Sequence, residues 1–132
     1  MRRHTTFKVG GPADVMVFPR GVAEVTAVLR YARAHDLATL VVGGGSNLLV
    51  RDGGFRGIVL NLKGTLNGLT AEAGDVLAGA GVRISTLLNF CVKRGLAGLE
   101  FLAGMPGMLG GALRGNAGAY GGNTADRLAA VR

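Results

Sequence analysis

The sequence predicts a small α/β (α+β) fold, in which a strand–helix–strand unit is followed by a second region of short strands and one helix. Apolar runs at 15–18 and 39–42 have the length of strands. The segment between them, 21–35, places apolar residues on one helical face, namely Val22, Val25, Leu29 and Ala32. A second helical pattern occupies 84–92.

The order strand, helix, strand is that of a right-handed crossover unit, whose two strands are parallel. We therefore expect 15–18 to be a short buried strand and a parallel neighbour of 39–42. A further strand is expected at 57–62. Open α/β sheets bind ligands at the carboxyl ends of their strands. The segment after residue 42 is thus a candidate binding site.

The second half of the chain gives weaker strand signals. Residues 76–80 are a strand candidate, and the stretch 63–75, rich in Gly, Thr and Ala, is typical of hairpins or small strands. This stretch also predicts a boundary between two subdomains, 1–65 and 66–132.

The helix predicted at 84–92 has a clear apolar face, formed by Ile84, Leu87, Leu88, Cys91 and Val92. Gly95 is expected to cap its carboxyl end. Cys91 lies on the apolar face, so it is predicted to be a core residue rather than a nucleophile.

The composition limits the class of protein. A chain of 132 residues, 48% apolar, forms one domain or a piece of a larger one. No apolar run is long enough for a membrane span, and the start lacks a hydrophobic signal region. A single cysteine suits a reducing compartment, so we expect a cytoplasmic protein.

The net charge of +7 raises the question of nucleic acid. The arginines are scattered, however, and an aromatic content of 5% offers few surfaces on which bases could stack. The charge instead favours attraction of a small polyphosphate ligand, and no nucleic-acid partner is predicted.

Three glycines and two small polar residues follow the run at 39–42, and they form the first candidate ligand loop: Gly43, Gly44, Gly45, Ser46, Asn47 and Leu48. Successive main-chain N–H groups in such a loop can converge on a phosphate or pyrophosphate. A hairpin turn is the alternative. The dinucleotide fingerprint fails because Leu48 occupies its third glycine position, and no Walker loop is present. The residues from Leu48 to Val50 are expected to form a strand before a turn.

A second glycine-rich segment runs from Gly104 to Gly122. Its density of glycine predicts neither a helix nor a strand. A flexible loop is the alternative, but solvated linkers are rich in Ser, Glu and Lys, whereas Met105, Met108 and Leu109 are apolar. An apolar segment of this kind favours a planar ligand lying against the backbone.

Several motifs, taken together and in this order, closely resemble the UDP-N-acetylenolpyruvoylglucosamine reductase (MurB) family of bacterial cell-wall synthesis. They are His4-Thr-Thr-Phe-Lys-Val-Gly-Gly-Pro-Ala-Asp14, Gly43-Gly-Gly-Ser-Asn-Leu-Leu-Val50, Gly98-Leu-Glu-Phe-Leu-Ala-Gly-Met-Pro-Gly107, Gly110-Gly-Ala-Leu-Arg114 and Asn116-Ala-Gly-Ala-Tyr-Gly121. The resemblance covers nearly the whole chain.

The resemblance implies a FAD-binding fold of the vanillyl-alcohol oxidase type, with a small β-α-β subdomain, a second α+β subdomain and non-covalent FAD between them. Residues Gly43 to Leu48 would then contact the pyrophosphate. The ribityl chain and the isoalloxazine ring would be lined by Gly104, Pro106, Gly107, Met108, Gly110, Gly111, Asn116, Ala117 and Gly118. In the family, NADPH reduces the flavin, which passes hydride to the enolpyruvyl group of a UDP-sugar.

Two residues depart from the family pattern, since Met108 and Gly115 stand where a small or β-branched residue and Met are usual. The family's catalytic residues and its substrate-binding domain would lie beyond Arg132. We therefore expect no catalytic residue in this chain and no turnover by it alone. A non-catalytic flavin or nucleotide module is one alternative. A sugar or alcohol oxidase of the same fold is another, disfavoured because the glycine-rich loops offer no His or Cys for a covalent flavin.

Other candidates for chemistry are weak. His4, His35 and Cys91 lack the spacing of metal ligands, so no metal is predicted. His35 is expected to be a solvated helix end. Glu100 is a candidate partner for an arginine such as Arg114, and Tyr120 is expected to pack.

Overall fold

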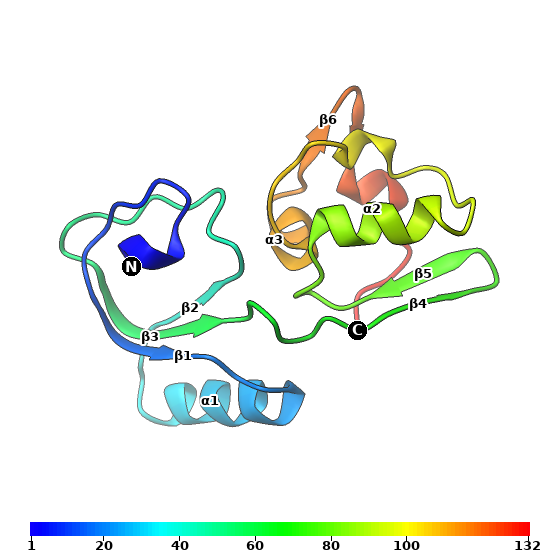
Figure 1. Ribbon diagram of the computed structural model, residues 1–132. Coiled ribbons are helices and arrows are strands. Elements are labelled where there is room, and N and C mark those ends of the chain that lie inside the picture. Colours follow the sequence, from blue (N-terminus) through cyan, green and yellow to red (C-terminus); the bar gives the residue numbers. More distant parts are fainter. The chain divides into compact units, whose positions relative to one another are not determined.

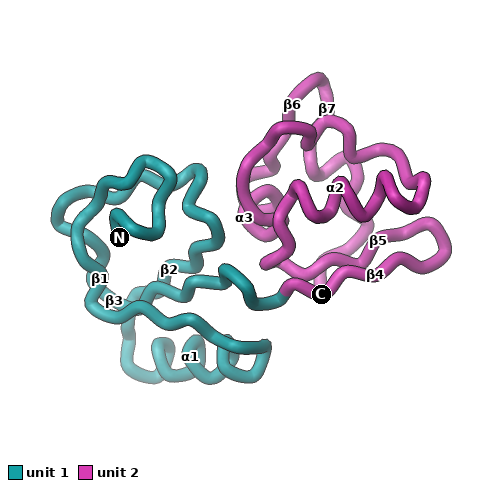
Figure 2. Tube along the Cα trace, in the orientation of Figure 1, with its two compact units in different colours: residues 1–66 teal, residues 67–132 magenta.

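The computed structural model describes all residues, 1–132, as two compact units, Met1–Leu66 and Asn67–Arg132 (Figure 2). Each unit has its own secondary structure and its own hydrophobic core. The observed division after Leu66 falls within the stretch that the sequence marks as a boundary. No helix in either unit is long and apolar enough to cross a membrane.

The first unit is a three-stranded parallel sheet with one long helix. Its elements are β1 (Ala13–Val17), α1 (Val22–Ala34), β2 (Thr39–Val42) and β3 (Phe55–Asn61), preceded by the short 3-10 helix Arg2–His4. Figure 1 shows α1 on one side of the sheet and the N-terminal segment on the other. The core lies on the side of the N-terminal segment, where Met1, Val42, Val50 and Val59 pack together.

The strand order β1-β3-β2 corrects one expectation. Both β1 and β2 pair with β3 in parallel, so they are parallel to each other but are not neighbours. The reason is the composition of β3, whose Ile58, Val59 and Leu60 are 6%, 0% and 0% exposed. A strand with such a continuous apolar run is favoured in the centre of a parallel sheet, where both faces are covered.

The edge strand β1 is less buried than expected, since Val15 is 49% exposed and Phe18, just beyond the strand, is 56% exposed. The helix α1 agrees with the predicted 21–35 within a residue at each end. Its predicted apolar face is only partly packed, because Ala32 is buried whereas Val22 is 66% exposed. Helical spacing identifies the helix, but it does not establish how much of the apolar face is covered.

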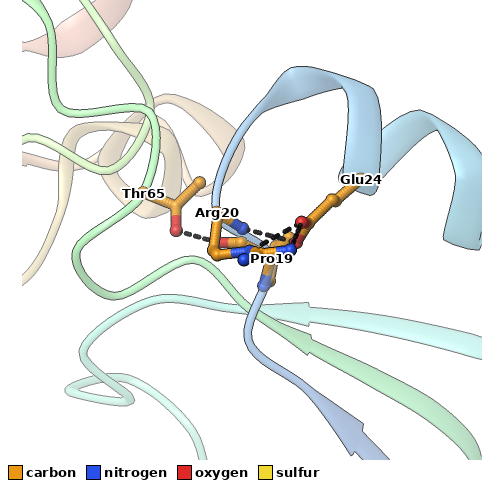
Figure 3. Close-up of polar contacts among 4 residues, drawn as sticks. All are labelled: Pro19, Arg20, Glu24 and Thr65. Atoms are coloured by element: carbon orange, nitrogen blue, oxygen red, sulfur yellow. Dashed lines mark hydrogen bonds and ion pairs between the residues drawn. The ribbon is translucent and has the colours of Figure 1, made fainter.

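Two contacts fix the start of α1 (Figure 3). The Glu24 carboxylate accepts hydrogen bonds from the Arg20 main-chain N–H at 2.8 Å and from Arg20 Nε at 2.7 Å. The hydrogen bond with the Arg20 side chain is the main cause that lowers the pKa of Glu24. The buried Thr65 hydroxyl donates to the Pro19 carbonyl. The hydrogen bond from Thr65 ties the segment after β1 to the segment after β3.

The second unit is built from two hairpins and short helices (Figure 1). Strands β4 (Leu69–Glu72) and β5 (Asp75–Ala78) form an antiparallel pair. They precede α2 (Ile84–Val92), the 3-10 helix Glu100–Leu102, α3 (Leu109–Arg114), the pair β6 (Gly118–Ala119) and β7 (Gly122–Asn123), and the 3-10 helix Thr124–Arg127.

The helix α2 has the bounds that the sequence predicts, and Cys91 is buried at 4% exposure. Gly95 has the left-handed φ of +66° that a helix end requires, and Leu96 N–H donates to the Cys91 carbonyl at 3.0 Å. The expected cap and the expected core position of Cys91 are both confirmed.

The expectation that 104–122 holds no helix or strand is wrong, since α3, β6 and the first residue of β7 lie within it. Contacts outside the helix stabilise α3: the N–H groups of Leu109 and Gly110 donate to the carbonyls of Val82 and Ala80, each at 2.9 Å. An added Cβ at Gly110 would lie 2.9 Å from the Ala80 Cβ. Close packing here outweighs the low helix propensity of glycine.

Candidate functional site

The candidate phosphate loop, 43–47, follows β2 directly and is anchored in the core at both ends. Val42, before the loop, and Val50, after it, are buried at 5% and 9% exposure, and Leu48 packs on the same core. The residues from Leu48 to Val50 form no strand, which corrects a sequence expectation. Their apolar side chains are explained by packing on the core, so Leu48 can serve a ligand only through its main chain.

Gly45 is the left-handed residue of this loop, with φ of +67°. An added Cβ there would lie 2.1 Å from the His4 carbonyl oxygen. Thr6 N–H donates to the Gly45 carbonyl at 3.0 Å. The loop and the N-terminal segment therefore pack backbone to backbone, and glycine is required at position 45.

The Gly45 carbonyl is engaged, but three main-chain donors of the loop are not. No hydrogen bond within the chain uses the N–H groups of Gly43, Gly44 and Asn47. Main-chain N–H groups left without an acceptor at the end of a parallel strand are suited to an anion. No helix follows the loop, so any anion there is bound by these loop donors without a helix dipole.

A small hollow of about 110 Å³ lies beside the loop. We call it the cationic hollow, and it is lined by Arg3, His4, Thr5, Thr6, Gly43, Gly44, Asn61 and Lys63. Two of these side chains are cationic and none is acidic. This combination of charge and main-chain donors fits a phosphate or diphosphate group.

Sequence analysis did not single out Arg3, Asn61 or Lys63. Asn61 ends β3 and Lys63 follows it, next to the end of β2 in the sheet. The rule that places ligands at the carboxyl ends of parallel strands could have identified both residues, once β3 was assigned to the centre of the sheet.

Two buried polar residues line the hollow, Thr5 at 6% exposure and Asn61 at 2%. Asn61 is the one that contacts the His4 ring. Its Oδ1 accepts a hydrogen bond from Lys63 N–H at 2.9 Å, and its Nδ2 lies 3.4 Å from His4 Nδ1. The His4 ring also packs near Phe18, with 5.7 Å between ring centroids. The imidazole is therefore held by contacts at two positions.

The second-unit residues that sequence analysis assigns to the flavin fall into two groups. Gly104 and Gly111 are exposed, and an added Cβ at either would meet nothing within 4 Å. Pro106 is also exposed. Met108 is buried at 6% exposure, and Ala117 packs on the core of the unit. Open backbone for a flat ligand is thus found at Gly104 and Gly111.

The remaining members of the set hold the unit together. An added Cβ at Gly118 would lie 2.5 Å from the Gly122 carbonyl, across the hairpin. Asn116 Oδ1 accepts from Ala125 N–H at 2.9 Å, and the Gly107 carbonyl accepts from Ile84 N–H at 3.1 Å. Gly110 packs on Ala80. These residues shape the segment.

Sequence analysis also made predictions for Glu100, Tyr120 and His35, of which only that for His35 is confirmed. Glu100 does not pair with Arg114; its carboxylate accepts from Gly98 N–H at 2.9 and 2.8 Å, and this lowers the pKa of Glu100. Tyr120 is 85% exposed at the tip of the β6–β7 hairpin, so the expectation of packing is wrong. His35 is exposed at the end of α1, as expected, with its ring 4.3 Å from that of Tyr31.

Comparisons with known proteins identify the family of the chain. The family model described as "FAD binding domain" matches residues 13–132. A UDP-N-acetylenolpyruvoylglucosamine reductase of Geobacter metallireducens is 51% identical over 97% of this chain and 43% of its own length, and that of Rubrobacter xylanophilus is 45% identical over 95% and 42%.

Among solved structures, UDP-N-acetylenolpyruvylglucosamine reductase (MurB) from Thermus caldophilus matches with a TM-score of 0.67 and 34% identity, over 95% of this chain and 43% of that one. The chain thus spans less than half the length of the curated relatives it matches. With a family model that covers most of its length and similarity to these reductases from end to end, the chain belongs to the FAD-binding domain family.

Proposed function

We propose that residues 1–132 are the FAD-binding portion of a UDP-N-acetylenolpyruvoylglucosamine reductase. The observation that carries the proposal is the cationic hollow, where main-chain donors of Gly43 and Gly44 lack partners within the chain and lie beside Arg3 and Lys63. A diphosphate supplies both the acceptors and the negative charge that this arrangement lacks. The family relationship and the similarity to named reductases support the same assignment.

In this proposal the main chain of Gly43 to Leu48 holds the FAD pyrophosphate, and Ser46 and Asn47 add polar side chains. The glycine-rich segment of the second unit serves the ribityl chain and the ring, with Gly104 and Gly111 as its open positions. Met108, Gly110, Ala117 and Gly118 act through the shape that they give the segment. Hydride transfer from NADPH to the enolpyruvyl group of the UDP-sugar is the chemistry that bound flavin supplies.

We propose further that the whole protein uses NADPH to reduce the enolpyruvyl group of the UDP-sugar. This reaction would serve peptidoglycan synthesis in the bacterial cytoplasm. Because the chain spans less than half the length of its relatives, the function that we assign to residues 1–132 is cofactor binding. We expect these residues alone to bind FAD without reducing the UDP-sugar.

Titration of the chain with FAD and with riboflavin, followed by flavin fluorescence, tests the proposal. Riboflavin carries the ring and the ribityl chain but no phosphate. We expect FAD to bind at least ~10-fold more tightly, because hydrogen bonds to charged groups are worth about 1.5–3 kcal/mol. Absence of FAD binding, or equal affinity for the two ligands, would contradict the proposal.

A pair of glycine variants localises the effect. Gly44→Val places a branched side chain on the exposed backbone that lines the hollow, and we expect it to abolish the preference for FAD over riboflavin. Gly53→Val is the matched control, since Gly53 is exposed and an added Cβ would meet nothing within 4 Å. It should retain the affinity of the unaltered chain.

A further inference from the structure

We propose that His4 is a phosphate-binding residue of this chain and that Asn61 positions its imidazole for the task. The inference rests on the proposed function, because the phosphate concerned is the diphosphate of FAD. It assigns a donor to the cationic hollow beyond the glycine loop, and it gives the buried Asn61 a role there.

The first step is the orientation of the Asn61 carboxamide. Lys63 N–H can only donate, and it lies 2.9 Å from the Asn61 side chain. The carbonyl oxygen of the amide must therefore face Lys63. The NH₂ group then faces His4, with 3.4 Å between Asn61 Nδ2 and His4 Nδ1.

The second step follows from the chemistry of the two groups. An amide NH₂ donates hydrogen bonds and does not accept them. His4 Nδ1 must accept, so the proton of the neutral imidazole resides on Nε2. The tautomer of His4 is thus set by a residue that is itself 2% exposed and held by the main chain.

The third step is the place of the ring. His4 lines the cationic hollow together with Gly43, Gly44 and the cationic residues Arg3 and Lys63. The Thr5 hydroxyl is engaged elsewhere, because it donates to the Val9 carbonyl at 3.1 Å. With Nδ1 occupied by Asn61, Nε2–H is the ring donor that remains for an anion. Hydrogen bonds of this charge-assisted kind are the strong ones.

Nitrogen NMR of the imidazole rings tests the positioning directly. The chain has only two histidines, so His35, exposed at the end of α1, is an internal reference. We expect neutral His4 to show the Nε2–H tautomer. Asn61→Asp replaces the donor by an acceptor, so the proton of His4 should then be found on Nδ1. An Nδ1–H tautomer in the unaltered chain would overturn the inference.

The same spectra identify the phosphate. We expect FAD to shift His4 Nε2, whereas riboflavin and UDP-N-acetylglucosamine leave it unchanged. A shift caused by UDP-N-acetylglucosamine and not by FAD would assign the hollow to the diphosphate of a UDP-sugar and would overturn the inference. His35 should not respond to any of the three ligands.

An affinity measurement completes the test. His4→Phe keeps a ring beside Phe18 but removes both nitrogens, and we expect it to lose about 10-fold or more in FAD affinity with riboflavin affinity unchanged. His35→Phe is the matched control and should change neither. An equal loss of both ligands in His4→Phe would mean a structural role, which overturns the inference but leaves the proposed function intact. Failure of the unaltered chain to bind FAD would overturn both.

Discussion

The main-chain N–H of Thr6 donates to the carbonyl of Gly45 at 3.0 Å, which joins the N-terminal segment to the loop after β2. Thr6 and Gly45 thereby bring His4 and Arg3 beside the donors of Gly43 and Gly44 in the cationic hollow. One backbone contact thus connects the fold of the first unit with the geometry of its candidate site.

Substitution of Gly45 by Ala should destabilise the first unit by about 3–4 kcal/mol, because left-handed strain of about 1–2 kcal/mol adds to displacement of the His4 carbonyl. Gly64→Ala is the control, since Gly64 also has a positive φ, +86°, but open space around it. It should cost only the strain. Hydrogen exchange of the β3 amides measures both variants. Equal losses would show that the contact with His4 contributes nothing.

Leu60→Ala tests the central position of β3. Leu60 is 0% exposed, so its truncation should cost about 2–5 kcal/mol in the stability of the first unit. Leu49 has the same side chain but is 70% exposed, and Leu49→Ala should change stability by less than about 0.5 kcal/mol. Chemical unfolding followed by far-UV circular dichroism distinguishes them. A small effect at Leu60 would contradict the strand order.

Two adjacent glycines of α3 should respond in opposite directions. Gly111→Ala meets open space and should stabilise the second unit by about 0.5–1 kcal/mol through helix propensity. Gly110→Ala should destabilise it, because the new Cβ would lie 2.9 Å from that of Ala80. If Gly111 lines the flavin ring, Gly111→Ala also weakens FAD and riboflavin equally, as ligand titration will show. Unchanged affinity for both would remove Gly111 from the flavin site.

The ion pair between β1 and β3 predicts a pH effect. Arg56 donates to the Asp14 carboxylate at 2.6 Å, and this hydrogen bond is the main cause that lowers the pKa of Asp14. Since the folded pKa lies below the unfolded one, the contribution of Asp14 to stability is present above its usual pKa. It is lost as the pH falls through the folded value.

Carboxyl NMR titration checks this effect. Arg56→Gln should raise the pKa of Asp14 towards its usual range and leave that of Glu24 low, because Glu24 pairs with Arg20. Arg20→Gln should raise the pKa of Glu24 and leave that of Asp14 low. An Asp14 midpoint that does not respond to Arg56→Gln would contradict the assignment.

Much of the first unit could be predicted from local pattern. Helical spacing located α1 within a residue at each end, and the apolar run 39–42 has the bounds of β2. The strand order was not predictable in the same way, because periodicity describes one segment at a time. That β3 separates β1 from β2 depends on competition for the most buried position, which the run Ile58 to Leu60 occupies.

The candidate site shows the same limit. The glycine loop at 43–45 could be recognised from the sequence, because the conformational freedom of glycine follows from its lack of a side chain. The contributions of Arg3 and Lys63 depend on chain segments that meet only in the folded unit. In the second unit, α3 was missed because its helix depends on hydrogen bonds to the loop before α2, which outweigh the propensity of its two glycines.

The most direct test of the central claim is the response of individual main-chain amides to FAD, measured by proton–nitrogen correlation NMR on the full chain. We predict that FAD shifts the amide signals of Gly43, Gly44 and Asn47, the donors without a partner, and that riboflavin does not. FAD that binds without moving these three amides would contradict the assignment of the loop as the diphosphate site.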